Sequence, residues 1–139
     1  MLINHSRSTS ILFCVCITLF PLSSSAADWK EYFVNQAGVR FSIDSSSVVT
    51  TREGKVRAWE QQKWAKEDPK FGLGFLYLIE VDCRQRTYAY KDIAPIKGNL
   101  EAMQMVPTMM EMYGGVNYFQ PNDLDEARYT AFCVTFRQK

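Results

Sequence analysis

Two cysteines, Cys83 and Cys133, are the residues of this chain whose chemistry is easiest to predict. Thiols on one domain usually pair in an oxidising compartment, and these two allow only one intramolecular disulfide. The alternatives are two separate buried thiols or an intermolecular bond. A disulfide that closes a loop of this length would stabilise the domain by roughly 3 to 4 kcal/mol.

The start of the chain indicates which compartment the protein reaches. A polar segment with one basic side chain, Arg7, is followed by the apolar run ILFCVCITLFPL and the small residues SSSAA. That order is typical of a secretory signal peptide, and the run is too short to span a membrane. We therefore predict a signal peptide over residues 1–27 and an exported domain over residues 28–139, in the periplasm, on the outer-membrane surface or outside the cell, with no membrane span after cleavage. Neither Cys14 nor Cys16 follows a small residue, so we predict no lipid anchor.

Catalysis is the function that the composition favours least. Cleavage after Ala27 removes His5, the only histidine, and with it the commonest general base and metal ligand. Acidic pairs such as Glu80 with Asp82 have the spacing of an exposed surface, without the cleft that acid–base catalysis needs. We expect no enzyme and no cofactor. Fifteen basic and fifteen acidic side chains remain after the cleavage, so no strong field attracts nucleic acid.

Basic and aromatic side chains are interleaved in two segments of the chain. If Cys83 faces inward, the alternation of side chains along a strand turns Arg84 outward. The basic and aromatic residues of the two segments would then form a binding face. The residues predicted to form it are Lys55, Arg57, Trp59, Lys63, Arg84, Arg86, Tyr88 and Tyr90. Such combinations are enriched at interface hot spots, so we expect an acidic protein segment or a sulfated glycan as the partner. The alternative is an ordinary solvated sheet face whose aromatic residues are covered by the helix.

Five methionines gather in the segment NLEAMQMVPTMMEMYGG. They are Met103, Met105, Met109, Met110 and Met112. Thioethers suit copper(I), so an alternative function is periplasmic copper handling, or an envelope-accessory role, through this segment. We favour a flexible apolar insert, over about residues 99–115, that packs loosely on the sheet or on a partner. Pro107 interrupts the helical spacing that would place three of the methionines on one face.

Strands must position the basic and aromatic residues. The segment GVRFSID alternates apolar and polar residues, and residues 55–64 and 75–83 form two further strand-like runs. A single strand through to Tyr90 would be far longer than usual, so we predict a tight reversal near residues 84–86.

The segment PNDLDEARYTAFCVTF predicts a C-terminal helix. Asn122 is placed to cap it, and acidic residues occupy the first turn. Tyr129, Phe132, Cys133 and Phe136 then form one apolar stripe, which must pack on the sheet. The sequence therefore predicts an α+β fold, a small antiparallel β-sheet with a C-terminal helix tethered to it by the disulfide.

The order of these segments resembles a known family. After a leading DW, the stretches GVRFSIDSSSV, KVRAWEQQKW, LIEVDCRQRTYAY and YFQPNDLDEARYTAFC are together similar to the surface-adhesin protein E domain of Gram-negative bacteria. The resemblance covers nearly the whole exported part, and its most specific element is Asp82-Cys83 with Cys133. It implies a helix joined to an antiparallel sheet, adhesion to host matrix proteins and a homodimer. We therefore expect a binding module for a host-matrix or envelope partner.

Overall fold

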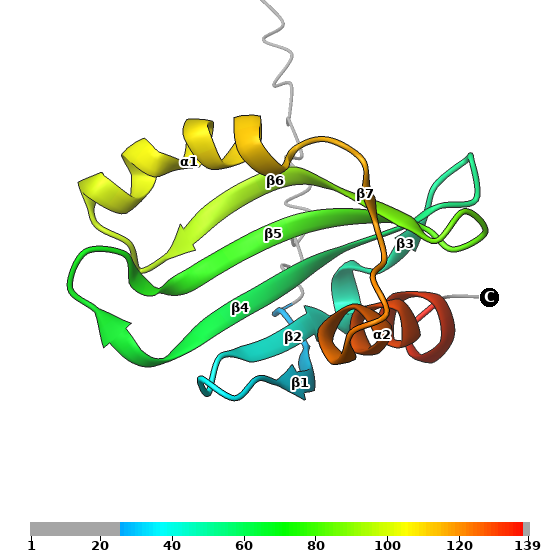
Figure 1. Cartoon of the computed structure of the whole chain (residues 1–139), viewed down its shortest axis with the longest axis horizontal. Helices are drawn as coiled ribbons and strands as arrows, with labels where there is room; N and C mark the ends of the chain where they lie inside the picture. The colour runs from blue at the N-terminus through cyan, green and yellow to red at the C-terminus, as the bar shows by residue number, and fades with distance from the viewer. Residues whose placement is uncertain (1–25, 138–139) are drawn as a thin grey trace, which may run out of the picture.

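The computed structural model describes residues 26–137, which form an antiparallel sheet of seven strands with two helices (Figure 1). The sheet order is β1-β2-β4-β5-β6-β7, and β3 pairs with β4. The strands are β1 (Trp29–Val34), β2 (Arg40–Asp44), β3 (Val49–Thr50), β4 (Val56–Asp68), β5 (Gly72–Asp82), β6 (Thr87–Ile96) and β7 (Asn117–Tyr118). The helical elements are η1 (Ser45–Ser47), α1 (Leu100–Tyr113), α2 (Asp123–Thr130) and the π-helical turn η2 (Ala131–Thr135). The predicted fold class is confirmed.

The predicted signal peptide, with Cys14 and Cys16, lies almost wholly outside the described residues. Within residues 26–137, no helix has the length and apolarity that crossing a membrane requires.

The three predicted strands correspond to β2, β4 and β5, and the reversal after β5 is where the spacing placed it. β5 ends at Asp82 and β6 begins at Thr87. The Asp82 carboxylate accepts hydrogen bonds from the backbone N–H groups of Arg84 and Gln85, each at 3.0 Å. Aspartate side chains often accept hydrogen bonds from the backbone in this way in turns, which explains why the reversal is tight.

The two faces of the sheet differ in what covers them. On the covered face, Val56 lies opposite Val81 and Ala58 opposite Ile79, and all four are fully buried. Side chains of α1 and of η2 join the same core, led by the fully buried Phe132 of η2. We call the other side the open face; its central positions on β4 and β5 are Arg57, Trp59, Gln61, Lys63, Leu76, Leu78 and Glu80.

A β-bulge in β6 changes which residues face the core. The register shifts between Leu78 and Ile79, so that Ile79 pairs with Tyr90 and Leu78 with Asp92, leaving Lys91 as an extra residue. Because side chains alternate along a strand, one extra residue exchanges the two faces. The core face therefore carries Tyr90 before the bulge and Ile93 after it.

The C-terminal helix is held to the sheet as predicted. The side chain of Asn122 caps α2 by accepting a hydrogen bond from the N–H of Asp125 at 2.9 Å. Cys133, in η2, forms a disulfide with Cys83 at the end of β5, with their Cα atoms 5.7 Å apart. The predicted pairing of these cysteines is confirmed.

The methionine-rich segment is a regular helix, α1, which lies along β6 (Figure 1). Asn99 caps it by accepting a hydrogen bond from the N–H of Ala102 at 3.0 Å. Pro107 lies inside the helix without ending it, so the expected interruption is wrong. Packing compensates for the hydrogen bond that proline cannot donate, since Met109 and Met110 contact the core.

Candidate binding face

Four of the predicted binding residues lie on or beside the open face. Arg57, Trp59 and Lys63 are alternate residues of β4, and Lys55 comes just before that strand. The side chain of Arg57 is 42% exposed and that of Lys55 is 34% exposed. These side chains are therefore accessible, and their backbone is fixed by a pairing with β5 that runs almost the length of β4.

Tyr88 and Tyr90 lie on the opposite, covered face, so the two predicted stripes do not share one side of the sheet. Their rings pack within an aromatic cluster, with Tyr90 at 5.1 Å from Tyr77 and Tyr88 at 4.9 Å from Phe119, measured between ring centroids. Burial raises the pKa of both tyrosines above its ordinary value. The prediction turned Arg84 and the residues beyond it outward, whereas Tyr88 pairs with Val81 and faces inward with it.

Of the two arginines of the reversal, Arg86 turns its side chain toward α2, away from the open face. Arg86 has a left-handed backbone, with φ of 52°, and its guanidinium pairs with Glu126 of α2 at 2.7 Å. The same group lies 4.1 Å from the ring centroid of Tyr129. Arg84 is exposed and forms no ion pair within residues 26–137. Arg86 thus helps to hold α2, and neither arginine extends the row on β4.

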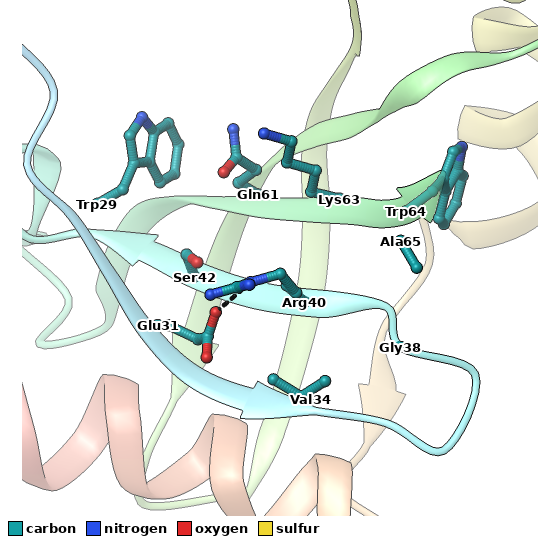
Figure 2. A pocket seen from close by; sticks show the side chains of 10 residues that line it. All are labelled: Trp29, Glu31, Val34, Gly38, Arg40, Ser42, Gln61, Lys63, Trp64 and Ala65. Atoms are coloured by element: carbon teal, nitrogen blue, oxygen red, sulfur yellow. Dashed lines mark hydrogen bonds and ion pairs between the residues drawn. The ribbon is translucent and has the colours of Figure 1, made fainter. Parts of the chain in front are cut away.

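A groove that the sequence did not predict opens at one end of the open face (Figure 2). It has a volume of about 720 Å³ and lies over β1, β2 and β4. Its lining residues are Trp29, Glu31, Val34, Gly38, Arg40, Ser42, Gln61, Lys63, Trp64 and Ala65. The contribution of β1 was missed because a register shift between Glu31 and Phe33 breaks the alternation that predicts a strand.

The charges of the groove are arranged unevenly. Arg40 pairs with Glu31, so their charges largely compensate each other. Figure 2 shows Lys63 beside Gln61 on β4, apart from that pair. Lys63 forms no ion pair with any residue that the structure describes. Among the described residues, the groove therefore presents the unpaired cation of Lys63, with Gln61 between it and the indole of Trp29.

The methionines do not gather around one point. Met109 and Met110 pack on the core, whereas Met103 is 59% exposed and Met112 is 67% exposed. Within residues 26–137, no group of three or more His, Cys, Asp or Glu side chains could hold a metal ion. No observation here favours the copper alternative, and it stays an untested prediction.

No family model matches the chain, and neither a curated protein nor a solved structure matches it. The resemblance to the surface-adhesin protein E domain therefore stays a prediction, as do adhesion and the homodimer.

Proposed function

We propose that the protein is an exported binding module whose open face takes an acidic segment of a host-matrix or envelope protein. The row formed by Arg57, Trp59, Gln61 and Lys63 on β4 supports this proposal most directly. Alternate strand residues point to one side, and the six residue steps from Arg57 to Lys63 span about 20 Å. That length suits an extended segment or a loop of a partner protein.

The composition of the row favours a protein partner. Trp59 lies opposite Leu78, and both are partly exposed, so an indole and an aliphatic side chain provide apolar contact at the centre. Arg57 and Lys63 stand at the two ends of the row. An aromatic anchor flanked by cations is a common hot-spot arrangement, and the free charge of Lys63 favours an acidic partner.

The predicted export agrees with the same function. The disulfide between Cys83 and Cys133 is compatible with an oxidising compartment. The predicted signal peptide would deliver the chain there, and mass spectrometry of the protein from the cell envelope should find an N-terminus at Asp28. A chain that still begins near Met1 would contradict export by this route.

Site-specific crosslinking in intact cells tests the binding face. A photoreactive residue at Gln61, between Trp59 and Lys63, should give a crosslinked species with a partner protein. The control places the same residue at Leu100 on α1, which is 70% exposed and lies away from the open face. Crosslinks from Leu100 but not from Gln61 would overturn the proposal.

A binding assay tests the class of partner. The purified domain is measured against immobilised fibronectin, laminin and type IV collagen, and against any envelope protein that the crosslinks identify. The double variant Trp59→Ala/Lys63→Ala should weaken binding about tenfold or more, because hot-spot residues carry most of the affinity. Leu100→Ala should leave it unchanged. Equal affinity of the folded double variant would exclude the row on β4. Sedimentation of the purified wild-type domain would test the predicted homodimer.

A further inference from the structure

A second concave site lies beyond the other end of the row on β4, centred on the carboxylate of Glu80. Glu80 faces Arg57 across the β4–β5 pairing and is only 9% exposed. One of its oxygens, Oε2, accepts hydrogen bonds from Nε of Arg57, at 3.1 Å, and from Nη2 of the same guanidinium. This pair fixes the Arg57 side chain over the strand.

The other oxygen, Oε1, has two lysines beside it. The Nζ atoms of Lys55 and Lys91 lie 3.7 and 3.5 Å from it. Both distances exceed those of a strong charge-assisted hydrogen bond. Lys55 Nζ also lies 3.1 Å from Oε2 of Glu53, whose side chain is 74% exposed. The lysine side chains are 34% and 43% exposed, so solvent and a dissolved anion can reach both ammonium groups.

The cations of this site outnumber its carboxylates. The pocket has a volume of about 570 Å³ and is lined by Arg52, Lys55, Arg57 and Lys91, with Glu53 and Glu80 as the only acidic lining residues. Although burial raises the pKa of Glu80, the hydrogen bond from Arg57 and the charges of Lys91 and Lys55 lower it below its ordinary value. Glu80 is therefore ionised at neutral pH. Even with Arg57 paired to Glu80 and Lys55 paired to Glu53, the four cations of the lining exceed its two carboxylates by two, in a concave surface that focuses their field.

The positions of the two lysines are fixed by local structure. The turn before Lys55 is closed by hydrogen bonds from Thr51 N–H to the Lys55 carbonyl, at 2.7 Å, and from Gly54 N–H to the Thr51 carbonyl, at 2.9 Å. Lys91 is the extra residue of the bulge in β6, and bulges often re-aim a side chain at a site. The cations are thus held near one another before any ligand arrives.

We propose that this pocket is an anion site for a tetrahedral oxyanion, a sulfate or phosphate group, held between the ammonium groups of Lys55 and Lys91. Because both Nζ atoms lie near Oε1 of Glu80, the distance between them cannot exceed the sum of their two distances to that oxygen. A group whose oxygens each accept from one ammonium at about 2.8 Å can bridge such a gap. Arg52, which forms no ion pair within residues 26–137, supplies a further donor at the rim.

The anion pocket shares Arg57 with the row on β4, but the residues that the two sets of experiments change are different. Lys55 and Lys91 do not line the groove of Figure 2, and Lys63 does not line the anion pocket. Loss of sulfate binding and loss of crosslinks from Gln61 are therefore separate results.

Titration by nuclear magnetic resonance tests the site. Sodium sulfate and sodium phosphate are added to the 15N-labelled exported domain while sodium chloride keeps the ionic strength constant, because salt screens exposed charges. Saturable shifts are expected at the amides of residues 51–57, Glu80 and Lys91. A sulfated disaccharide and glycerol phosphate then distinguish a sulfate ester from a phosphate ester as the natural source. No saturable shift with any of the four, or shifts spread evenly over the surface, would overturn the proposal.

Matched variants localise the effect. Lys55→Gln/Lys91→Gln should weaken sulfate binding about tenfold or more, since each charge-assisted hydrogen bond is worth about that factor. Lys55→Arg/Lys91→Arg keeps both charges and should retain binding, and Lys70→Gln, which removes an exposed lysine paired with Glu101, should change nothing. Thermal unfolding confirms that each variant is folded. Unchanged binding in the folded glutamine variant would assign the anion to other residues and overturn the proposal.

Discussion

Arg128 of α2 forms two parallel hydrogen bonds with Glu60 at the centre of β4, Nε to Oε2 at 2.8 Å and Nη2 to Oε1 at 3.0 Å. Their side chains are 3% and 0% exposed. Tyr32 and Gln62 also donate to the Glu60 carboxylate. Although burial alone would lower the pKa of Arg128, the charge of Glu60 raises it well above its ordinary value. The pair joins the helix to the sheet in a place where neither charge can reach water.

The first prediction is that breaking this pair destabilises the fold strongly. Arg128→Met should lower the free energy of unfolding by about 3 to 5 kcal/mol, because it leaves the Glu60 carboxylate buried without its cation. Glu60→Gln/Arg128→Met should recover part of that loss, since position 60 then carries no buried charge. Guanidinium denaturation of the wild type, Arg128→Met and the double variant measures the three free energies of unfolding.

An exposed ion pair provides the control for that comparison. Lys70 and Glu101 lie 3.0 Å apart with side chains more than half exposed. Lys70→Met should cost less than about 1 kcal/mol, because water screens surface pairs. Equal losses in Arg128→Met and Lys70→Met would show that the buried pair is dispensable.

The second prediction concerns the disulfide. Cys83 and Cys133 are 50 residues apart in sequence, so their bond should contribute about 4 kcal/mol by restricting the unfolded chain. Cys133→Ser, or reduction of the wild-type protein, should lower the melting temperature by many degrees. The reduced wild type serves as the control for the variant, because both lack the bond. An unchanged unfolding transition would mean that the buried pair of Glu60 and Arg128 holds α2 without help.

Much of this fold follows from local sequence patterns. Alternation in GVRFSID predicted β2, and the asparagine cap with its acidic first turn predicted α2. The cysteine pairing was predictable because the predicted signal cleavage would leave only Cys83 and Cys133 in one small domain. Each of these inferences uses only residues that are close together in the sequence, or the number of residues of one type.

What the sequence did not reveal depends on contacts between distant residues. Nothing local shows that Glu60 is buried, since its neighbours on β4 include exposed charges and its partner Arg128 lies far along the chain. The register of the hairpin, in which Tyr88 pairs with Val81, decides that Tyr88 and Tyr90 face the core. The bulge at Lys91, which has no reliable sequence signal, then turns Ile93 to the same face. The candidate site was therefore half predicted, with the row on β4 found and the groove contributed by β1 missed.

The third prediction tests a close approach of two strands. Gly74 has φ of 140°, and a Cβ atom there would lie 2.0 Å from the carbonyl oxygen of Gln62 on β4. Gly74→Ala should therefore cost at least about 3 kcal/mol, because backbone must move to admit the methyl group. Gly54 also has positive φ, 79°, but open space around it, so Gly54→Ala should cost only about 1 to 2 kcal/mol. Urea denaturation of both variants measures the difference, and equal losses would contradict the close approach.

The last prediction uses the ion cluster around Glu80 and its dependence on pH. The surrounding cations, opposed by burial, hold the pKa of this carboxyl below its ordinary value of 4.5. A carboxyl with a lowered pKa in the folded state contributes stability above its unfolded pKa and loses it as the pH falls through the folded one. Wild type should therefore be more stable than Glu80→Gln at pH 6, and the difference should shrink as the pH is lowered below about 5. Denaturation of both proteins at each pH measures the difference, in which contributions of the other carboxylates largely cancel. A difference that is constant from pH 6 to the acid limit of folding would show that Glu80 does not titrate as the cluster of Arg57, Lys55 and Lys91 requires.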